Sequence, residues 1–123
     1  MKTLIALSLF LLAACPNDED GLAPREACES TAGALCARIY DCLSATELAR
    51  GGFPATEAEC AAKIEREQSC TTLDTRNACD DPDERYHADT AESCVLQIEG
   101  MSCAELRSGD IDGAAPACDR ICT

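Results

Sequence analysis

Apolar and small residues recur at intervals of three and four along much of the chain, which is the spacing of one face of a helix. The first such stripe contains Cys28, Ala32, Leu35, Cys36, Ile39 and Leu43. Pro24 suits the first turn of a helix, because the N–H that proline lacks would have no partner there. The pattern predicts a helix from about Pro24 to Cys42.

Two later stretches repeat this pattern. In the segment 90–99, one face is expected to hold Ala91, Cys94, Val95 and Ile98. In the segment 57–70, with cysteines near both ends, one side is expected to hold Ala61, Ile64 and Gln68. A buried stripe that contains cysteine places its sulfur against another element, so we expect disulfides between helices.

Four segments begin with a side-chain acceptor that is followed three residues later by glutamate, the spacing of a capping box. The pairs are Ser44 with Glu47, Thr56 with Glu59, Asp89 with Glu92, and Ser102 with Glu105. Glycines at 51, 100 and 109 supply plausible helix ends. The sequence therefore predicts an all-α fold, a small bundle of four or five short helices, over residues 25–123.

Composition changes this picture by showing how such a bundle can be stable. Leu, Ile, Val and Phe together fall below roughly 20% of the chain, which at a net charge of −13 would indicate disorder. The 11 cysteines place the chain among secreted disulfide scaffolds instead. Ten follow Cys15, enough for about five disulfides: Cys28, Cys36, Cys42, Cys60, Cys70, Cys79, Cys94, Cys103, Cys118 and Cys122.

Ten cysteines allow many pairings, and the sequence suggests only a few. If the helices at 24–42 and 57–70 are antiparallel, the end of the first helix and the start of the second bring two cysteines together. The two opposite ends of these helices bring another two together. The expected pairs are Cys42 with Cys60, Cys28 with Cys70, and Cys103 with Cys118 or Cys122. The chain has no C-x-x-C motif, so a structural role is favoured over redox or zinc chemistry.

The N-terminus predicts export and a lipid anchor. Lys2 precedes an apolar run from Leu4 to Ala14 that is too short to span a bilayer, so we interpret residues 1–14 as a signal peptide. The run ends in Leu12-Ala13-Ala14-Cys15, which resembles the lipobox of bacterial lipoproteins. The resemblance implies cleavage before Cys15 and acylation of its sulfur and its new amino group.

A lipid on Cys15 also explains the odd cysteine count, because ten cysteines remain to form disulfides. In lipoproteins of this type, Asp directly after the lipidated cysteine commonly marks retention at the inner membrane. This chain has Pro16 there, so the resemblance implies the outer membrane, with the domain facing the periplasm or the cell surface. We interpret residues 15–24 as the lipidated cysteine and an acidic tether.

Beyond the lipobox, the chain contains Leu35-Cys36-Ala37-Arg38, Asp41-Cys42, the run from Ser102 to Leu106 that leads to Gly109, and Ala117-Cys118. With these elements, the stretch from Arg25 to Cys122 loosely resembles small cysteine-rich helical lipoproteins of Gram-negative bacteria. These elements are short, and no functional residue is carried over from them.

Charge limits the partners and suggests one ligand. With 23 acidic and 10 basic side chains, the chain is a poor partner for nucleic acid and for anionic lipid surfaces. The acidic run could bind calcium through its carboxylates, a hard-cation site made of Asp80, Asp81, Asp83 and Glu84. Asp110 and Asp112 form a second fragment, and neither run matches an EF-hand. His87, the one histidine, is a weak metal candidate.

These features favour a lipid-anchored, disulfide-stabilised module for binding or structure in the bacterial envelope, with an unknown protein or envelope component as partner. No G-x-S-x-G motif is present, and we expect no enzymatic activity and no cofactor beyond the lipid on Cys15. A calcium-dependent binding module that uses residues 80–84 is the alternative. A thiol oxidoreductase is a third hypothesis.

Overall fold

The computed structural model describes residues 20–123. The expected signal peptide 1–14, Cys15 and the first part of the tether lie outside the described residues.

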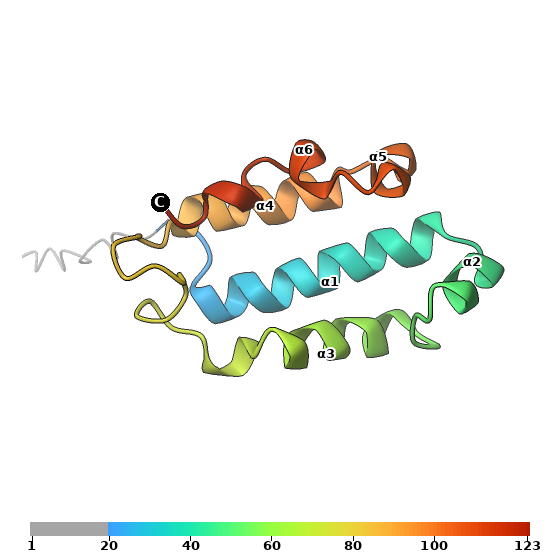
Figure 1. Cartoon of the computed structure of the whole chain (residues 1–123), viewed down its shortest axis with the longest axis horizontal. Coiled ribbons are helices and arrows are strands. Elements are labelled where there is room, and N and C mark those ends of the chain that lie inside the picture. Colours follow the sequence, from blue (N-terminus) through green and yellow to red (C-terminus); the bar gives the residue numbers. More distant parts are fainter. Residues whose placement is uncertain (1–19) are drawn as a thin grey trace, which may run out of the picture.

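A long central helix, α1 (Pro24–Cys42), organises the fold (Figure 1). Helix α3 (Glu57–Glu67) runs antiparallel to α1 on one side, and α4 (Ala88–Glu99) runs parallel to α1 on the other. Helices α2 (Ala45–Arg50) and α5 (Cys103–Ser108) lie at the far end of the molecule. The expected all-α fold is confirmed.

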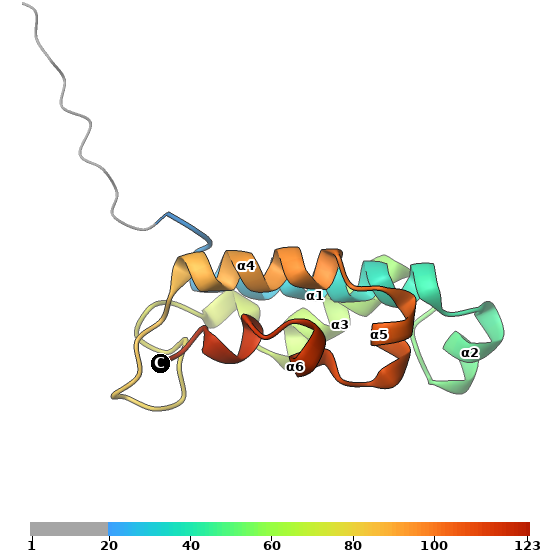
Figure 2. The same cartoon turned by 90° about the horizontal axis from the view of Figure 1, so that it is seen from above.

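The described part of the chain contains three further short elements, one α-helix and two 3-10 turns, so it has six α-helices where four or five were expected. They are α6 (Ile111–Ala114) and the 3-10 turns η1 (Cys70–Thr72) and η2 (Cys118–Arg120). After α5 the chain returns along the molecule toward the end where α1 and α4 begin (Figure 2). There one isolated antiparallel bridge joins Tyr86 to Cys122.

Helix α1 has many small buried side chains, and its position between two other helices explains why. A helix that contacts neighbours on two sides is buried around more of its circumference than one narrow stripe. Its buried residues are Pro24, Ala27, Ala32, Ala34, Cys36, Ile39 and Cys42. Beside it, the core cluster joins α1 to α4 and the returning chain: Ala34, Cys94, Val95, Ile98, Met101, Ala115 and Ala117. The predicted apolar face of α4 is therefore buried.

Three of the four predicted capping boxes are confirmed, at Ser44, Thr56 and Ser102. The fourth is wrong. Helix α4 begins earlier than the pattern suggested, with His87 at its N-cap position, so Asp89 lies inside the first turn. Its carboxylate accepts a hydrogen bond from the backbone N–H of Thr90 instead. Gly51, Gly100 and Gly109 are all C-caps, as predicted.

Five disulfides join all ten cysteines of the described residues. They are Cys28–Cys70, Cys36–Cys60, Cys42–Cys103, Cys79–Cys122 and Cys94–Cys118. Each closes a long loop, and the largest sequence separation is 61 residues. Disulfides persist in oxidising compartments, so these bridges indicate an environment outside the reducing cytosol.

The expected pairing of Cys28 with Cys70 is confirmed, together with the antiparallel arrangement that led to it. The register of that arrangement is wrong at the other end. Helix α2 and the turn after it occupy the space beyond α1, so α3 starts beside the C-terminal part of α1 rather than at its last residue. Cys60, in the first turn of α3, therefore meets Cys36 rather than Cys42.

The expected pairing of Cys103 with Cys118 or Cys122 is also wrong. Because α4 runs parallel to α1, its C-terminal end brings Cys103 to the end of α1, where it bonds to Cys42. The returning chain then carries Cys118 back to Cys94, and Cys122 to Cys79 in the loop before α4.

The α3 helix is shorter than predicted. It ends at Glu67 rather than Cys70, and Ser69 has a positive φ of 54°, a left-handed conformation that breaks the helical path. The chain then turns into η1, which places the fully buried Cys70 against Cys28.

Candidate binding site

A largely apolar pocket of about 350 Å³ lies between α1 and α3 in the described residues and is called here the α1–α3 pocket. From α1 it is lined by Pro24, Ala27, Cys28, Thr31, Ala32 and Leu35. The remaining walls come from Ile64, Gln68, Leu73, Ala78, Tyr86 and Ile121. Its volume lies within the range of ligand sites, roughly 300–1,000 Å³.

Helical spacing places the first two walls of the pocket. Ala27, Thr31 and Leu35 are four residues apart on α1, and Ile64 is four residues before Gln68 at the end of α3. Residues with this spacing lie on one helix face. The predicted side of the 57–70 segment, with Ile64 and Gln68, is therefore the side that faces the pocket.

Two chain segments far apart in sequence form the third wall. The Cys79–Cys122 disulfide ties the loop before α4 to the C-terminal segment. Backbone hydrogen bonds strengthen this connection: Arg85 and Thr123 bond to each other in both directions, and the His87 N–H donates to the carbonyl of Ile121 over 2.8 Å. These contacts hold Tyr86 and Ile121 beside the start of α1.

The chemistry of the lining is uncharged. None of the twelve lining residues is Asp, Glu, Lys, Arg or His, and Cys28 is held in a disulfide. The polar groups are the Thr31 hydroxyl, the Gln68 amide and the Tyr86 phenol, whose hydroxyl donates to the carbonyl of Leu22 over 2.6 Å. Such a site can take an apolar group but offers no countercharge to an ion.

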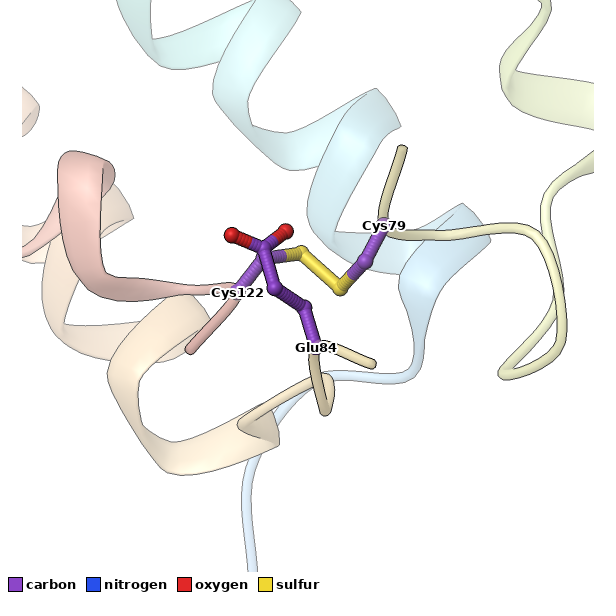
Figure 3. A group of neighbouring side chains, drawn as sticks. All are labelled: Cys79, Glu84 and Cys122. Atoms are coloured by element: carbon purple, nitrogen blue, oxygen red, sulfur yellow. A yellow bond between two sulfur atoms is a disulfide. The ribbon is translucent and has the colours of Figure 1, made fainter. Parts of the chain in front are cut away.

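One group of potential metal ligands occurs among the described residues, consisting of Cys79, Glu84 and Cys122 (Figure 3). Their ligand atoms lie within 4.8 Å of one another. The two sulfurs are bonded together, however, and a metal-binding cysteine must be a thiolate. In the disulfide-bonded protein this group contributes one carboxylate.

The candidate calcium ligands are exposed on the loop before α4. Glu84 points toward the Cys79–Cys122 disulfide, whereas the Asp81 carboxylate accepts the backbone N–H of Asp83 over 2.9 Å. Asp80, Asp81 and Asp83 do not join any group of three closely spaced ligands within residues 20–123. The structure thus places these four residues on one loop without gathering their carboxylates.

The remaining candidates lie at the starts of helices. The Asp110 carboxylate caps α6 by accepting the N–H of Gly113 over 2.9 Å, and Asp112 is exposed in its first turn. The His87 side chain is half-buried, and its Nε2 lies 3.0 Å from the Thr123 hydroxyl. Neither place brings further metal ligands together within the described chain.

An ion pair lies at the opposite end of the molecule, between α2 and α5. Arg107 donates to the Glu47 carboxylate over 2.5 Å, and Ser44 supplies further hydrogen bonds. The Arg107 bonds, then those of Ser44, lower the pKa of Glu47 to about 2. This pair joins two short helices and lies apart from the α1–α3 pocket.

No protein-family model, curated protein or solved structure matches this chain. Among the helices within residues 20–123, none is both long and apolar enough to cross a membrane.

Sequence reasoning did not find the α1–α3 pocket as a site. The stripes on α1 and α3 indicated buried faces, and this signal could have located two of its walls. Leu73, Ala78 and Tyr86 lie in a loop without periodicity, and Ile121 reaches the pocket only through the disulfide and backbone bonds of the C-terminal segment.

Proposed function

We propose that the protein is a lipid-anchored, disulfide-stabilised binding module of the bacterial cell envelope, held at the outer membrane by Cys15. One observation carries the proposal: the five disulfides use all ten cysteines after Cys15. Cys15, at the end of a lipobox-like sequence, is the cysteine that these bridges do not use. A lipid joined to the Cys15 sulfur by a thioether would give this remaining cysteine its own role, beside the ten that form disulfides.

Binding is favoured over a purely structural role by the α1–α3 pocket. A small protein core normally closes its apolar interior, whereas here apolar residues from four segments surround an open volume. The uncharged lining makes an apolar ligand or side chain the matching partner. The acidic surface, with a net charge of −13 for the chain, favours partners that are neutral or basic outside the pocket.

The intact mass of the membrane-extracted protein, alkylated without reduction, tests this proposal directly. We expect cleavage before Cys15, the mass of three acyl chains and no alkylated cysteine. A Cys15→Ser variant is the control and should lose the added lipid mass and the membrane attachment. An unacylated N-terminus in the wild type would overturn the anchor. Separation of inner from outer membranes then tests the location.

The calcium-dependent module remains an untested alternative, and no arrangement of ligands in the structure favours it. It predicts a higher melting temperature in millimolar calcium but not in magnesium. An unchanged melting curve would remove it.

A further inference from the structure

The α1–α3 pocket lies at the end of the domain where the tether joins it. Pro24, the first residue of α1, is part of the pocket wall. Just before it, Leu22 is fixed in two ways: its N–H donates to the carbonyl of Ala88 over 3.1 Å, and its carbonyl accepts the hydroxyl of Tyr86, itself a wall residue. The point of attachment is therefore held beside the pocket.

Close backbone packing strengthens this attachment. Gly21 has a φ of 133°, and a Cβ atom there would lie 2.3 Å from the carbonyl carbon of Ala88. Only glycine fits such a contact. The chain thus enters the domain by a path that both Gly21 and Leu22 define.

The tether is short enough to bring a lipid on Cys15 to the pocket. Five residue steps separate Cys15 from Asp20, the first described residue. At roughly 3.3–3.6 Å per extended residue, this length spans at most about 18 Å. A short connection also holds the attached group at an effective concentration on the order of millimolar, which favours it over a free competitor.

The lining selects the kind of group that can enter. A free fatty acid carries a carboxylate that needs a cation or several N–H donors when it leaves water, and no cationic side chain lines the pocket. An acyl chain in ester or amide linkage is uncharged. Each methylene that it buries favours the bound state about fourfold.

We propose that the α1–α3 pocket binds one acyl chain of the lipid on Cys15 of the same molecule. This inference rests on the proposed function. Two acyl chains would then remain for the membrane, and two anchoring signals suffice for stable attachment. Whenever the protein leaves the bilayer, the pocket removes part of its lipid from water. The pocket is thus a site for the protein's own anchor.

Photocrosslinking of the lipidated protein tests this proposal. Cells are supplied with a diazirine-bearing fatty acid, the protein is purified in detergent, the detergent is removed, and the sample is irradiated. After reduction and digestion, we expect the Cys15 peptide to be joined to peptides that contain Thr31 or Gln68. Mixing with a heavy-isotope copy should show that the crosslinks form within one molecule.

Charged variants provide the matched comparison. Thr31→Glu places a carboxylate in the wall, and we expect it to reduce these crosslinks at least tenfold. Ser30→Glu adds the same charge one position away, outside the lining, and should leave them unchanged. Gln68→Glu, at an exposed position on the opposite wall, repeats the test if the first variant fails to form its disulfides.

The outcomes separate this inference from the proposed function. Crosslinks that join Cys15 only to detergent or lipid, in protein whose mass shows the acyl chains, would overturn the pocket proposal and leave the anchor intact. Crosslinks between copies, or from free labelled phospholipid to the pocket, would also overturn it. A wild-type chain without acyl mass on Cys15 would remove both proposals.

Discussion

In a domain with few large apolar residues, the single side chain of Glu47 makes stabilising contacts with more than one helix. Its carboxylate closes the capping box of α2 and also binds Arg107 of α5, 60 residues away. Arg107 in turn donates to the carbonyl of Cys42, at the end of α1. Three helix ends therefore meet through one ion pair and its hydrogen bonds.

The lowered pKa of Glu47 predicts an acid dependence of stability. Its folded-state pKa is about 2, below its unfolded value, so its contribution is fully present above about pH 5 and is lost as the pH falls toward 2. We expect the melting temperature of wild type to fall more steeply between pH 5 and 2.5 than that of Glu47→Gln. Glu99→Gln, at the exposed end of α4, is the control and should follow wild type. Parallel curves for all three would contradict the assignment.

At the scale of elements, the short helices depend on their ends. Helices α2 and α5 have six residues each and contain no buried residue of their own. Isolated helices of this length are unstable in water, so capping and the contacts at their ends decide whether they form. Here the capping boxes at Ser44 and Ser102, and the Cys42–Cys103 disulfide at the first residue of α5, perform this role.

Removing one cap tests this dependence. Ser102→Ala deletes the acceptor of the Glu105 N–H, and the usual loss for such a change is about 1 kcal/mol. Asp89→Ala is the matched comparison, because Asp89 has a similar sequence context but does not cap α4. We expect chemical denaturation to show the larger loss for Ser102→Ala. Equal losses would mean that the box at Ser102 is not an important stabilising contact.

The whole molecule depends on its disulfides because its core is small. Among residues 20–123, the largest side chains that are fully buried are those of Cys36, Cys70 and Cys94, and all three are in disulfides. Closing loops of 15 to 100 residues contributes about 3–4.7 kcal/mol per bridge in the chain-entropy model. Stability thus comes chiefly from constraints on the unfolded chain.

Stepwise reduction should reveal an order among the five bridges. In Cys79–Cys122 neither cysteine is buried, whereas every other bridge contains a buried cysteine. We expect mild thiol treatment and alkylation mapping to open Cys79–Cys122 first and Cys36–Cys60 late, with full reduction abolishing the helical circular dichroism signal. Glu84→Gln should hasten the first step, because the carboxylate repels an incoming thiolate. Early labelling of Cys36 would contradict this order.

The sequence alone determined the local structure. The stripe from Cys28 to Ile39, the boxes at Ser44 and Ser102, and the even number of cysteines after Cys15 are properties of nearby residues, and they predicted helices, helix ends and a disulfide-stapled bundle correctly. The prediction of a cap at Asp89 was wrong because the capping pattern does not determine where a helix starts when buried contacts extend the helix before the pattern begins.

Only the tertiary structure decided which distant residues meet. The register of α3 against α1 places Cys60 beside Cys36, and the parallel direction of α4 places Cys103 beside Cys42. These choices depend on where α2 fits and how the whole core packs, and no local pattern records them. The α1–α3 pocket has the same origin, because its Tyr86 and Ile121 wall exists only where two loops are held together by a disulfide and backbone hydrogen bonds.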